Sequence, residues 1–243
     1  MNYYNLDTRQ ALHAATHDEM VIVVPIEQPP EGFIFYQLLK NGVEFYQPVP
    51  DKTIYQSTDI NGENIEPLFS YSRIPYPIGA RIGLRETWGK KGYFDREVNQ
   101  FLETGDYLYK ASYNNELIYR NWLSLQCQPI EAIRHWCTVT SARVDRVQNL
   151  NGHDFDLMTG LIGLASPDKI DCLKEDFNAR YSTPKPIKEN GEIVGYECYA
   201  WDCESFNYDK LTVNYTFDGW LWKGKPLTIH ANPFVEIFTV RKE

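Results

Sequence analysis

The fold is decided by residues 76–150, where strand patterns follow one another closely. This part consists of YPIGARIGLRETWG at 76–89, DYLYKASY at 106–113, NWLSLQCQPIEAIRHW at 121–136 and CTVTSARVDRVQNL at 137–150. The first, second and fourth pieces alternate apolar and polar residues, which predicts strands. The third piece has Pro129 where a short helix would begin, because proline suits the first helical turn. We therefore expect three strands and one short helix, with a polar excursion at 89–104 between the first two strands.

Further strands extend this pattern to both ends of the chain. MVIVVPI is a β-branched run typical of a buried strand, and FVEIFTVRK resembles it near the C-terminus. FIFYQLL and VEFYQPV flank Asn41-Gly42, a dipeptide that predicts a β-hairpin when it lies between apolar runs. Residues 50–75 are polar and predict a long loop. The expected fold class is α+β and β-rich, a small, mostly antiparallel barrel with strands near 20–26, 80–88, 106–113, 137–150 and 234–241.

The segment at about 154–230 is expected to decorate this barrel. Helical spacing predicts helices at 8–15, 154–165, 166–180 and 202–214. Asn190-Gly191 predicts a second hairpin for the same reason as the first. No internal repeat or low-complexity linker interrupts the chain. We therefore expect a single domain over 1–243 with an insertion at about 154–230.

The composition is ordinary for a globular protein, with 43% hydrophobic and 23% charged residues. No run approaches the roughly 18 apolar residues of a membrane-spanning helix. The N-terminus has no basic segment followed by an apolar one, so we expect no secretory signal. The five cysteines include no CxxC pair, which argues against a disulfide framework and against a zinc site. We expect a cytoplasmic protein without membrane contact, metal or cofactor.

The net charge of −9 argues against a protein that wraps duplex DNA by neutralising phosphates. The distribution of charge is more informative than the sum. Residues 1–75 carry four Lys and Arg against ten Asp and Glu, and residues 151–243 carry ten against 15. Residues 76–150 carry ten against eight, so this part alone is net positive. A surface for nucleic acid or another anion is expected there.

Five short blocks occur in an order that suggests a known family. They are Arg85-Glu86-Thr87-Trp88, Tyr109-Lys110-Ala111 with Tyr113, the segment from Trp122 to Pro129, Arg143-Val144-Asp145-Arg146, and Asn232-Pro233-Phe234-Val235. Together they resemble the ASCH/PUA-like proteins of phages and prophages. In that family R-E-T-W ends one strand, and N-P-W-V opens the last one. The resemblance implies a divergent member of the family with a PUA-like barrel.

The resemblance also implies a cleft that binds single-stranded nucleic acid, RNA or a modified nucleotide without catalysis. Such clefts recognise bases by stacking and by hydrogen bonds to base edges, which tolerates an acidic protein. The candidate ligand-binding residues are Arg85, Glu86, Trp88, Lys110, Tyr113, Trp122, Arg143 and Arg146. Each has a structural alternative. Arg85 and Glu86 point to opposite faces of a strand, so an Arg–carboxylate brace is as good an explanation as a ligand clamp, and Trp88 suits a core position.

The family's hydrolytic residues are replaced in this chain. Related amidohydrolases act on acylated cytidine through a Lys, a Thr and a downstream Glu. His17 stands near the lysine, Met20 near the threonine and Thr159 near the glutamate. An activated lysine needs a carboxylate partner, which Met and Thr cannot supply. We therefore rank three functions. Binding of nucleic acid or a nucleotide comes first, and a phage accessory protein that acts through contacts with a host or phage protein comes second. Hydrolysis of nucleic acid or modified nucleosides comes third.

Overall fold

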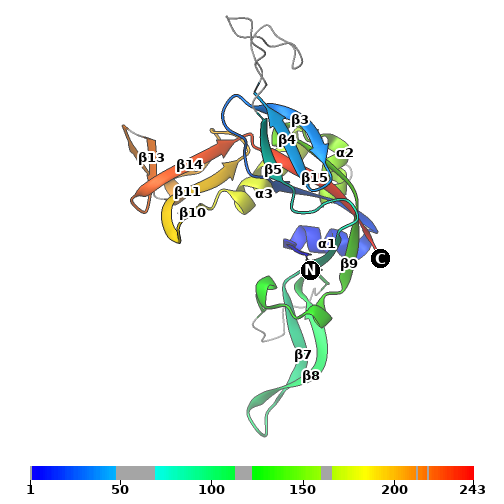
Figure 1. The fold of residues 1–243 in the computed structure, drawn as a ribbon. Coiled ribbons are helices and arrows are strands. Elements are labelled where there is room, and N and C mark those ends of the chain that lie inside the picture. Colours follow the sequence, from blue (N-terminus) through cyan, green and yellow to red (C-terminus); the bar gives the residue numbers. More distant parts are fainter. Residues whose placement is uncertain (1, 48–68, 113–121, 160–165, 212, 218) are drawn as a thin grey trace, which may run out of the picture.

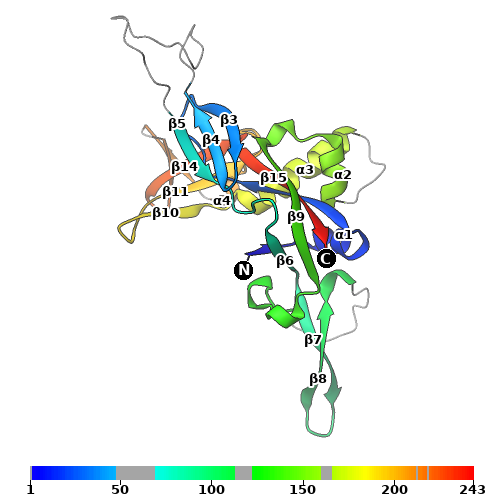
Figure 2. The ribbon, with the colours of Figure 1, turned by 45° about the vertical axis from the view of Figure 1, so that its right-hand side comes forward.

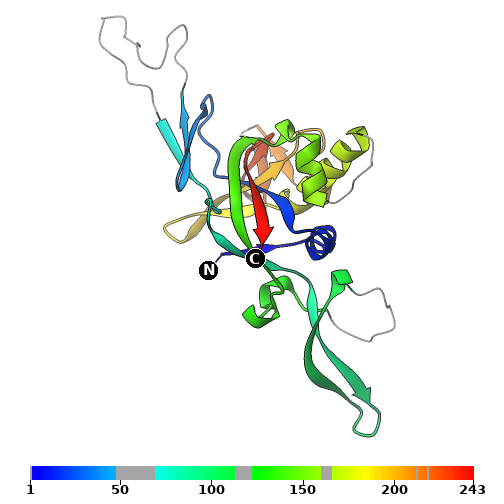
Figure 3. The ribbon, with the colours of Figure 1, turned by 90° about the vertical axis from the view of Figure 1, so that its right-hand side faces the viewer.

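A computed structural model describes residues 2–47, 69–112, 122–159, 166–211, 213–217 and 219–243. Its centre is a five-stranded main sheet in the order β1-β6-β9-β15-β2. The strands are β1 (Asn2–Asn5), β6 (Arg81–Arg85), β9 (His135–Arg146), β15 (Phe234–Lys242) and β2 (Glu19–Pro25). β1 is parallel to β6, and every other pair is antiparallel. The sheet curls into a half-barrel, which is visible where green β9 curves beside red β15 (Figure 3).

Both faces of the β2–β15 pair are covered, which explains the nearly continuous apolar sequence of these two strands. Ile22 and Phe238 point into the concave face, where α1 (Thr8–Thr16) contributes two buried alanines. Val23 and Ile237 point to the other face, against α2 (Gly152–Thr159) and α3 (Ser166–Tyr181). Figure 2 shows α2 and α3 together beside the main sheet. The two hydrophobic clusters hold the curl of the sheet from both sides.

Three further sheets surround the half-barrel (Figure 1). One is a meander of β3 (Ile34–Leu39), β4 (Gly42–Tyr46) and β5 (Phe69–Arg73). A projecting hairpin arm consists of β7 (Trp88–Asp95) and β8 (Gln100–Tyr109). The second five-stranded sheet contains β10 (Lys185–Glu189), β11 (Glu192–Ala200), β14 (Lys225–Ala231), β13 (Gly219–Trp222) and β12 (Asn214–Thr216), with α4 (Tyr208–Leu211) beside it. Short 3-10 turns lie at Lys110–Ser112, Leu125–Cys127, Ile130–Ala132 and Val147–Asn149.

The strands expected near 20–26, 80–88, 137–150 and 234–241 are confirmed as members of the main sheet. The strand expected at 106–113 is not in this sheet, because β8 pairs only with β7 among the described strands. Its last described residues form a 3-10 turn. The excursion at 89–104 was expected to be irregular and is instead most of the hairpin arm.

Other expectations were met in part. Both Asn-Gly hairpins are confirmed, as are the helix at the N-terminus and the helix at 166–180. Residues 69–73 form β5 rather than a loop, and the rest of that expected loop lies largely outside the described residues. Among the described residues of 202–214, only those of α4 are helical. The described part is therefore α+β and β-rich, and none of its helices is both long and apolar enough to cross a membrane.

Candidate functional site

Glu86, a predicted ligand residue, is part of a structural brace. It is 1% exposed, and Arg134 donates to its two oxygens at 2.6 Å from Nε and 2.8 Å from Nη2. The Arg134 guanidinium also lies over the Tyr109 ring, 4.4 Å from its centre. Burial raises the pKa of Glu86 above its ordinary value, and the hydrogen bonds from Arg134 oppose that shift. Both oxygens are occupied, so Glu86 holds β6 to the segment before β9 and is not free to bind a ligand.

Trp88 lies in the core at the base of the hairpin arm. It is 4% exposed, its indole N–H donates to the carbonyl of Ser124 at 3.2 Å, and its ring packs edge-on against Tyr107. A buried indole with a satisfied N–H is a packing residue. Trp122 lies against Gly89 of the same arm and is half-buried. These two tryptophans fasten the arm to the body, so we do not count them as stacking faces.

Lys110 lies at the end of β8 and not within a strand. Its backbone N–H donates to the carbonyl of Thr87 at 2.9 Å, and its side chain is exposed. Lys110 is therefore close to the end of β6 but faces solvent. Tyr113 lies outside the described residues, so its predicted role stays a prediction.

Arg143 and Arg146 lie near the far end of β9, away from the R-E-T-W residues. Arg143 pairs with Asp154 of α2 at 2.6 Å. Arg146 donates to the carbonyl of Asn232 at 2.9 Å, and its guanidinium lies 3.7 Å from the centre of the Phe234 ring. Both arginines therefore join β9 to neighbouring elements. The seven predicted residues that the structure describes do not meet in one cleft.

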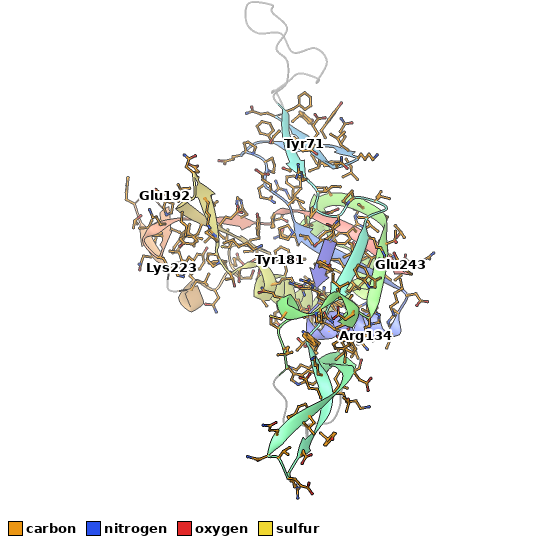
Figure 4. The ribbon with its side chains drawn as sticks, turned by 60° about the horizontal axis from the view of Figure 1, so that its bottom comes forward. Tyr71, Arg134, Tyr181, Glu192, Lys223 and Glu243 are labelled. Carbon is orange, nitrogen blue, oxygen red and sulfur yellow. The ribbon has the colours of Figure 1, made fainter. Side chains whose placement is uncertain are left out.

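The edges of the curled main sheet enclose a different site. Residues of both edge strands, β1 and β2, line an open cleft of about 470 Å³, which we call the seam cleft. Its lining residues are Tyr3, Tyr4, Asn5, Leu6, Asp7, Val24, Tyr76, Leu125, Arg180, Tyr181 and Lys185. Pockets of about 300–1,000 Å³ are typical for small ligands. Figure 4 shows Tyr181 of this cleft between the main sheet and the second sheet that carries Glu192 and Lys223.

Three side chains satisfy backbone carbonyls that the two edge strands leave unpaired. The Tyr76 hydroxyl donates to the carbonyl of Tyr3 at 2.9 Å, and Arg180 donates to that of Asn5 at 3.2 Å. The Tyr181 hydroxyl donates to the carbonyl of Val23 at 2.8 Å. These bonds replace the strand pairing that would close a barrel. The gap between β1 and β2 therefore stays open as a cleft, while these backbone carbonyls still accept hydrogen bonds.

Charge in the seam cleft is unevenly distributed. Arg180 pairs with Asp7 at 2.8 Å and also contacts the Tyr4 hydroxyl and the Gln10 side chain. Lys185 is exposed at the start of β10, and no described carboxylate forms an ion pair with it. The guanidinium of Arg85 lies 4.0 Å from the centre of the Tyr3 ring, also without an ion pair to a described residue. Lys185 and Arg85 are thus the cations that could meet an anion at this cleft.

Glu236 lies beneath the cleft wall. It is fully buried, and its cross-strand neighbour on the same face is Val24, a lining residue. Its Oε2 accepts the backbone N–H of Tyr76 at 3.3 Å, and its Oε1 has no partner among the described residues. Burial raises the pKa of Glu236 to about 7, because no described cation compensates the charged form. This carboxyl is the described group best suited to exchange a proton near the cleft.

The seam cleft was missed by sequence reasoning, although one signal for it was present. An acid within the apolar run FVEIF indicates a buried carboxyl, and this residue is Glu236. Tyr3, Arg180 and Lys185 carried no such signal, because they are far apart in sequence and meet only through the curl of the sheet. Within the described ranges no three His, Cys, Asp or Glu residues are placed to bind a metal ion. Comparison with family models, curated proteins and solved structures finds no match to this chain.

Proposed function

We propose that the protein is a PUA-like cleft protein of the phage or prophage type that binds single-stranded nucleic acid or a modified nucleotide, without catalysis, in the seam cleft. The observation that carries the proposal is the combination of tyrosine rings and cations around a space of ligand size. Tyr3 offers a ring, and Lys185 and Arg85 offer unpaired positive charge. Single-strand binding sites combine these two features, a stacking surface and a positive groove.

The overall negative charge is compatible with this proposal. A protein that contacts a few phosphates needs only a few correctly placed cations. Lys185 from the acidic C-terminal part lines the cleft, and Arg85 from the net-positive central part lies over the ring of the lining residue Tyr3. The acidic remainder disfavours long duplexes, so the proposal is restricted to a nucleotide or a short single strand.

Fluorescence anisotropy with labelled mononucleotides and short RNA and DNA strands tests the proposal. Tyr3→Ala should weaken binding about 5- to 150-fold, because stacking on one aromatic ring contributes about 1–3 kcal/mol per base. Lys185→Ala should lower the slope of log K against log salt by about 0.7, the value for one phosphate contact on a single strand. Thermal unfolding of each variant shows whether a loss of binding comes from a loss of fold.

Two control variants change the same residue types outside the cleft. Tyr215 is 70% exposed on β12, and Lys225 is exposed on β14. Tyr215→Ala and Lys225→Ala should bind as the unchanged protein does. Absence of binding at micromolar protein and low salt, or equal losses in the control variants, would refute the proposal.

A second candidate function is contact with a host or phage protein. The observation in its favour is the exposed apolar surface on the β3–β5 meander. Its members are Ile34, Phe35, Leu39, Phe69 and Tyr71, each 37–53% exposed. By strand register, four of these residues share one face of the sheet, whereas Phe35 lies on the opposite face beside the buried Phe45. Apolar side chains gathered on one face are typical of a protein interface. Changing Ile34 and Tyr71, which share one face, to serine should abolish capture of such a partner from host lysate and leave nucleotide binding unchanged. The seam-cleft variants should lose nucleotide binding and keep the partner.

A further inference from the structure

A row of side chains leads away from the seam cleft across the outer face of the main sheet. Tyr3 of β1, Gly83 of β6 and Trp136 of β9 are direct cross-strand partners. Arg81 and Arg85 lie two residues before and after Gly83, so their side chains are on the same face as that glycine. Two aromatic rings and two guanidinium groups therefore surround one residue that has no side chain.

The distances show that these groups form one continuous surface, the outer patch of Arg81, Tyr3, Arg85 and Trp136. The ring centres of Tyr3 and Trp136 are 6.2 Å apart. The guanidinium of Arg85 lies 4.0 Å from the centre of the Tyr3 ring, and that of Arg81 lies 4.3 Å from the centre of the Trp136 ring. A Cβ at Gly83 would lie 3.0 Å from Tyr3 and 3.2 Å from Trp136, so glycine is what lets the rings approach each other. Each guanidinium thus lies over one face of a ring, and the two cation–ring pairs adjoin along the patch.

Beyond Trp136 the surface opens into a second hollow of about 270 Å³, the end pocket. It is lined by Arg81, Arg134, His135, Trp136, Lys242 and Glu243. Figure 4 shows Arg134 and Glu243 on the side of the molecule away from the second sheet.

Positive charge dominates the end pocket, although not all of it is free. Arg81 pairs with Glu243 at 2.8 Å and keeps 53% of its side chain exposed, while Arg134 is held by Glu86. Lys242 forms no ion pair with a described residue. Burial and the charges of Arg134 and Lys242 lower the pKa of His135 to about 4, so this ring is neutral at pH 7. Lys242 and the exposed part of Arg81 can therefore meet a phosphate.

We propose that the binding site continues from the seam cleft over the outer patch into the end pocket, so that the chain holds a single strand of at least three nucleotides. This inference rests on the proposed function. Tyr3 belongs to both the seam cleft and the outer patch, and Trp136 and Arg81 belong to both the patch and the end pocket. Rings paired with cations give a single strand both stacking partners for its bases and positive charge for its phosphates. A duplex, whose bases are stacked inside, could not use the rings.

A length series distinguishes this inference from the proposed function. Labelled strands of one, two, three and five nucleotides are titrated by anisotropy at several salt concentrations. The affinity of the unchanged protein should rise up to at least three nucleotides. In Arg81→Ala/Lys242→Ala the mononucleotide should bind as before, while the salt slope for the trinucleotide should fall by about 1.4, two phosphate contacts at about 0.7 each.

A second variant and a matched control complete the test. Trp136→Ala should weaken trinucleotide binding about 5- to 150-fold, the effect of one lost stacking ring. Lys188→Ala/Lys225→Ala removes two exposed lysines of the second sheet and should change nothing. The extended path is overturned if three nucleotides bind no more tightly than one. It is also overturned if both variants leave the affinity and the salt slope of the trinucleotide unchanged. In either case the proposal of binding in the seam cleft stands. No binding at any length overturns the proposed function and this inference together.

Discussion

Glu236→Gln should change how the stability of the protein depends on pH. The carboxyl is fully buried with one unpartnered oxygen, and burial raises its pKa to about 7 from a reference value near 4.5. A raised pKa means that the folded state binds the proton more tightly than the unfolded state does. The contribution of Glu236 to stability is therefore complete below about pH 4.5 and is lost as the pH rises through 7.

The magnitude follows from the same shift. A difference of about 2.5 units corresponds to about 3 kcal/mol between the protonated and ionised limits. Of this, about 2–3 kcal/mol falls between pH 5 and pH 8, because the unfolded carboxyl is already mostly ionised at pH 5. Glutamine has nearly the same shape and no charge. Any hydrogen bonds that its amide fails to make therefore change the free energy of unfolding by the same amount at every pH. As the pH rises from 5 to 8, the free energy of unfolding of Glu236→Gln should thus increase by about 2–3 kcal/mol relative to that of the unchanged protein.

Urea unfolding at half-unit steps of pH measures this difference directly. Other titrating groups cancel, because both proteins share them. The groups that face Glu236 are Tyr76 and, behind it, Tyr4; the pKa of Tyr76 is raised to about 12, so it does not titrate in the window. Two parallel curves of unfolding free energy against pH would refute the reasoning, because they would mean that Glu236 ionises as easily in the folded state as in the unfolded state.

The remaining predictions concern the brace, the seam and catalysis. Arg134→Ala should lower the free energy of unfolding by about 3–5 kcal/mol, because it leaves the buried Glu86 carboxylate without a partner; a loss under 1 kcal/mol in urea unfolding would contradict the brace. Tyr181→Phe should lower the free energy of unfolding by about 1–3 kcal/mol, since the buried carbonyl of Val23 loses its hydrogen-bond donor. A thermal unfolding curve unchanged from that of the parent protein would show that this hydrogen bond contributes nothing to stability. Purified protein incubated with N4-acetylcytidine should release no acetate above buffer, and release that scales with protein and survives repurification would restore the hydrolase alternative.

The parts of the fold that could be predicted are those that local signals determine. Asn190 and Gly191 take positive φ angles of 50° and 87°, which is the reason this dipeptide identifies a tight hairpin turn from sequence alone. The β-branched run of β2 and the apolar run of β15 predicted buried strands because both faces of these two strands are covered. The R-E-T-W block was expected to end one strand, and Arg85 does end β6, but Trp88 already begins β7.

The hairpin arm could not be predicted because its sequence carries no local signal of this kind. Most of its residues are exposed on both faces, so the sequence from 89 to 104 shows no apolar alternation. Its pairing depends on ladder hydrogen bonds and on cross-strand pairs such as Lys90–Glu103, which leave no periodic signal. β5 was missed similarly, because it is five residues long and only Ser72 is buried.

The candidate site was predicted less well than the fold because a motif in sequence need not be a site in space. Glu86 follows Arg85 directly, yet Glu86 turns inward to Arg134 while Arg85 turns outward to Tyr3. The alternation of a strand separates neighbours, and the curl of the sheet joins residues that are more than 170 positions apart, such as Asp7 and Arg180. Of the seven predicted residues that the structure describes, Arg85 alone keeps a place in the proposed binding surface.

The position of Arg85 links the two proposals. Its guanidinium covers the ring of Tyr3, which lines the seam cleft, and its strand neighbour Arg81 covers Trp136 at the end pocket. β6 therefore carries both arginines of the outer patch on one face, while its opposite face presents the buried Ile82 and Leu84. Because one short strand supplies both the core and the charged surface, a register shift of one residue would expose the apolar pair and bury both charges. The core of the half-barrel thus fixes the outer patch in place, and a binding surface there needs no support from the more distant sheets.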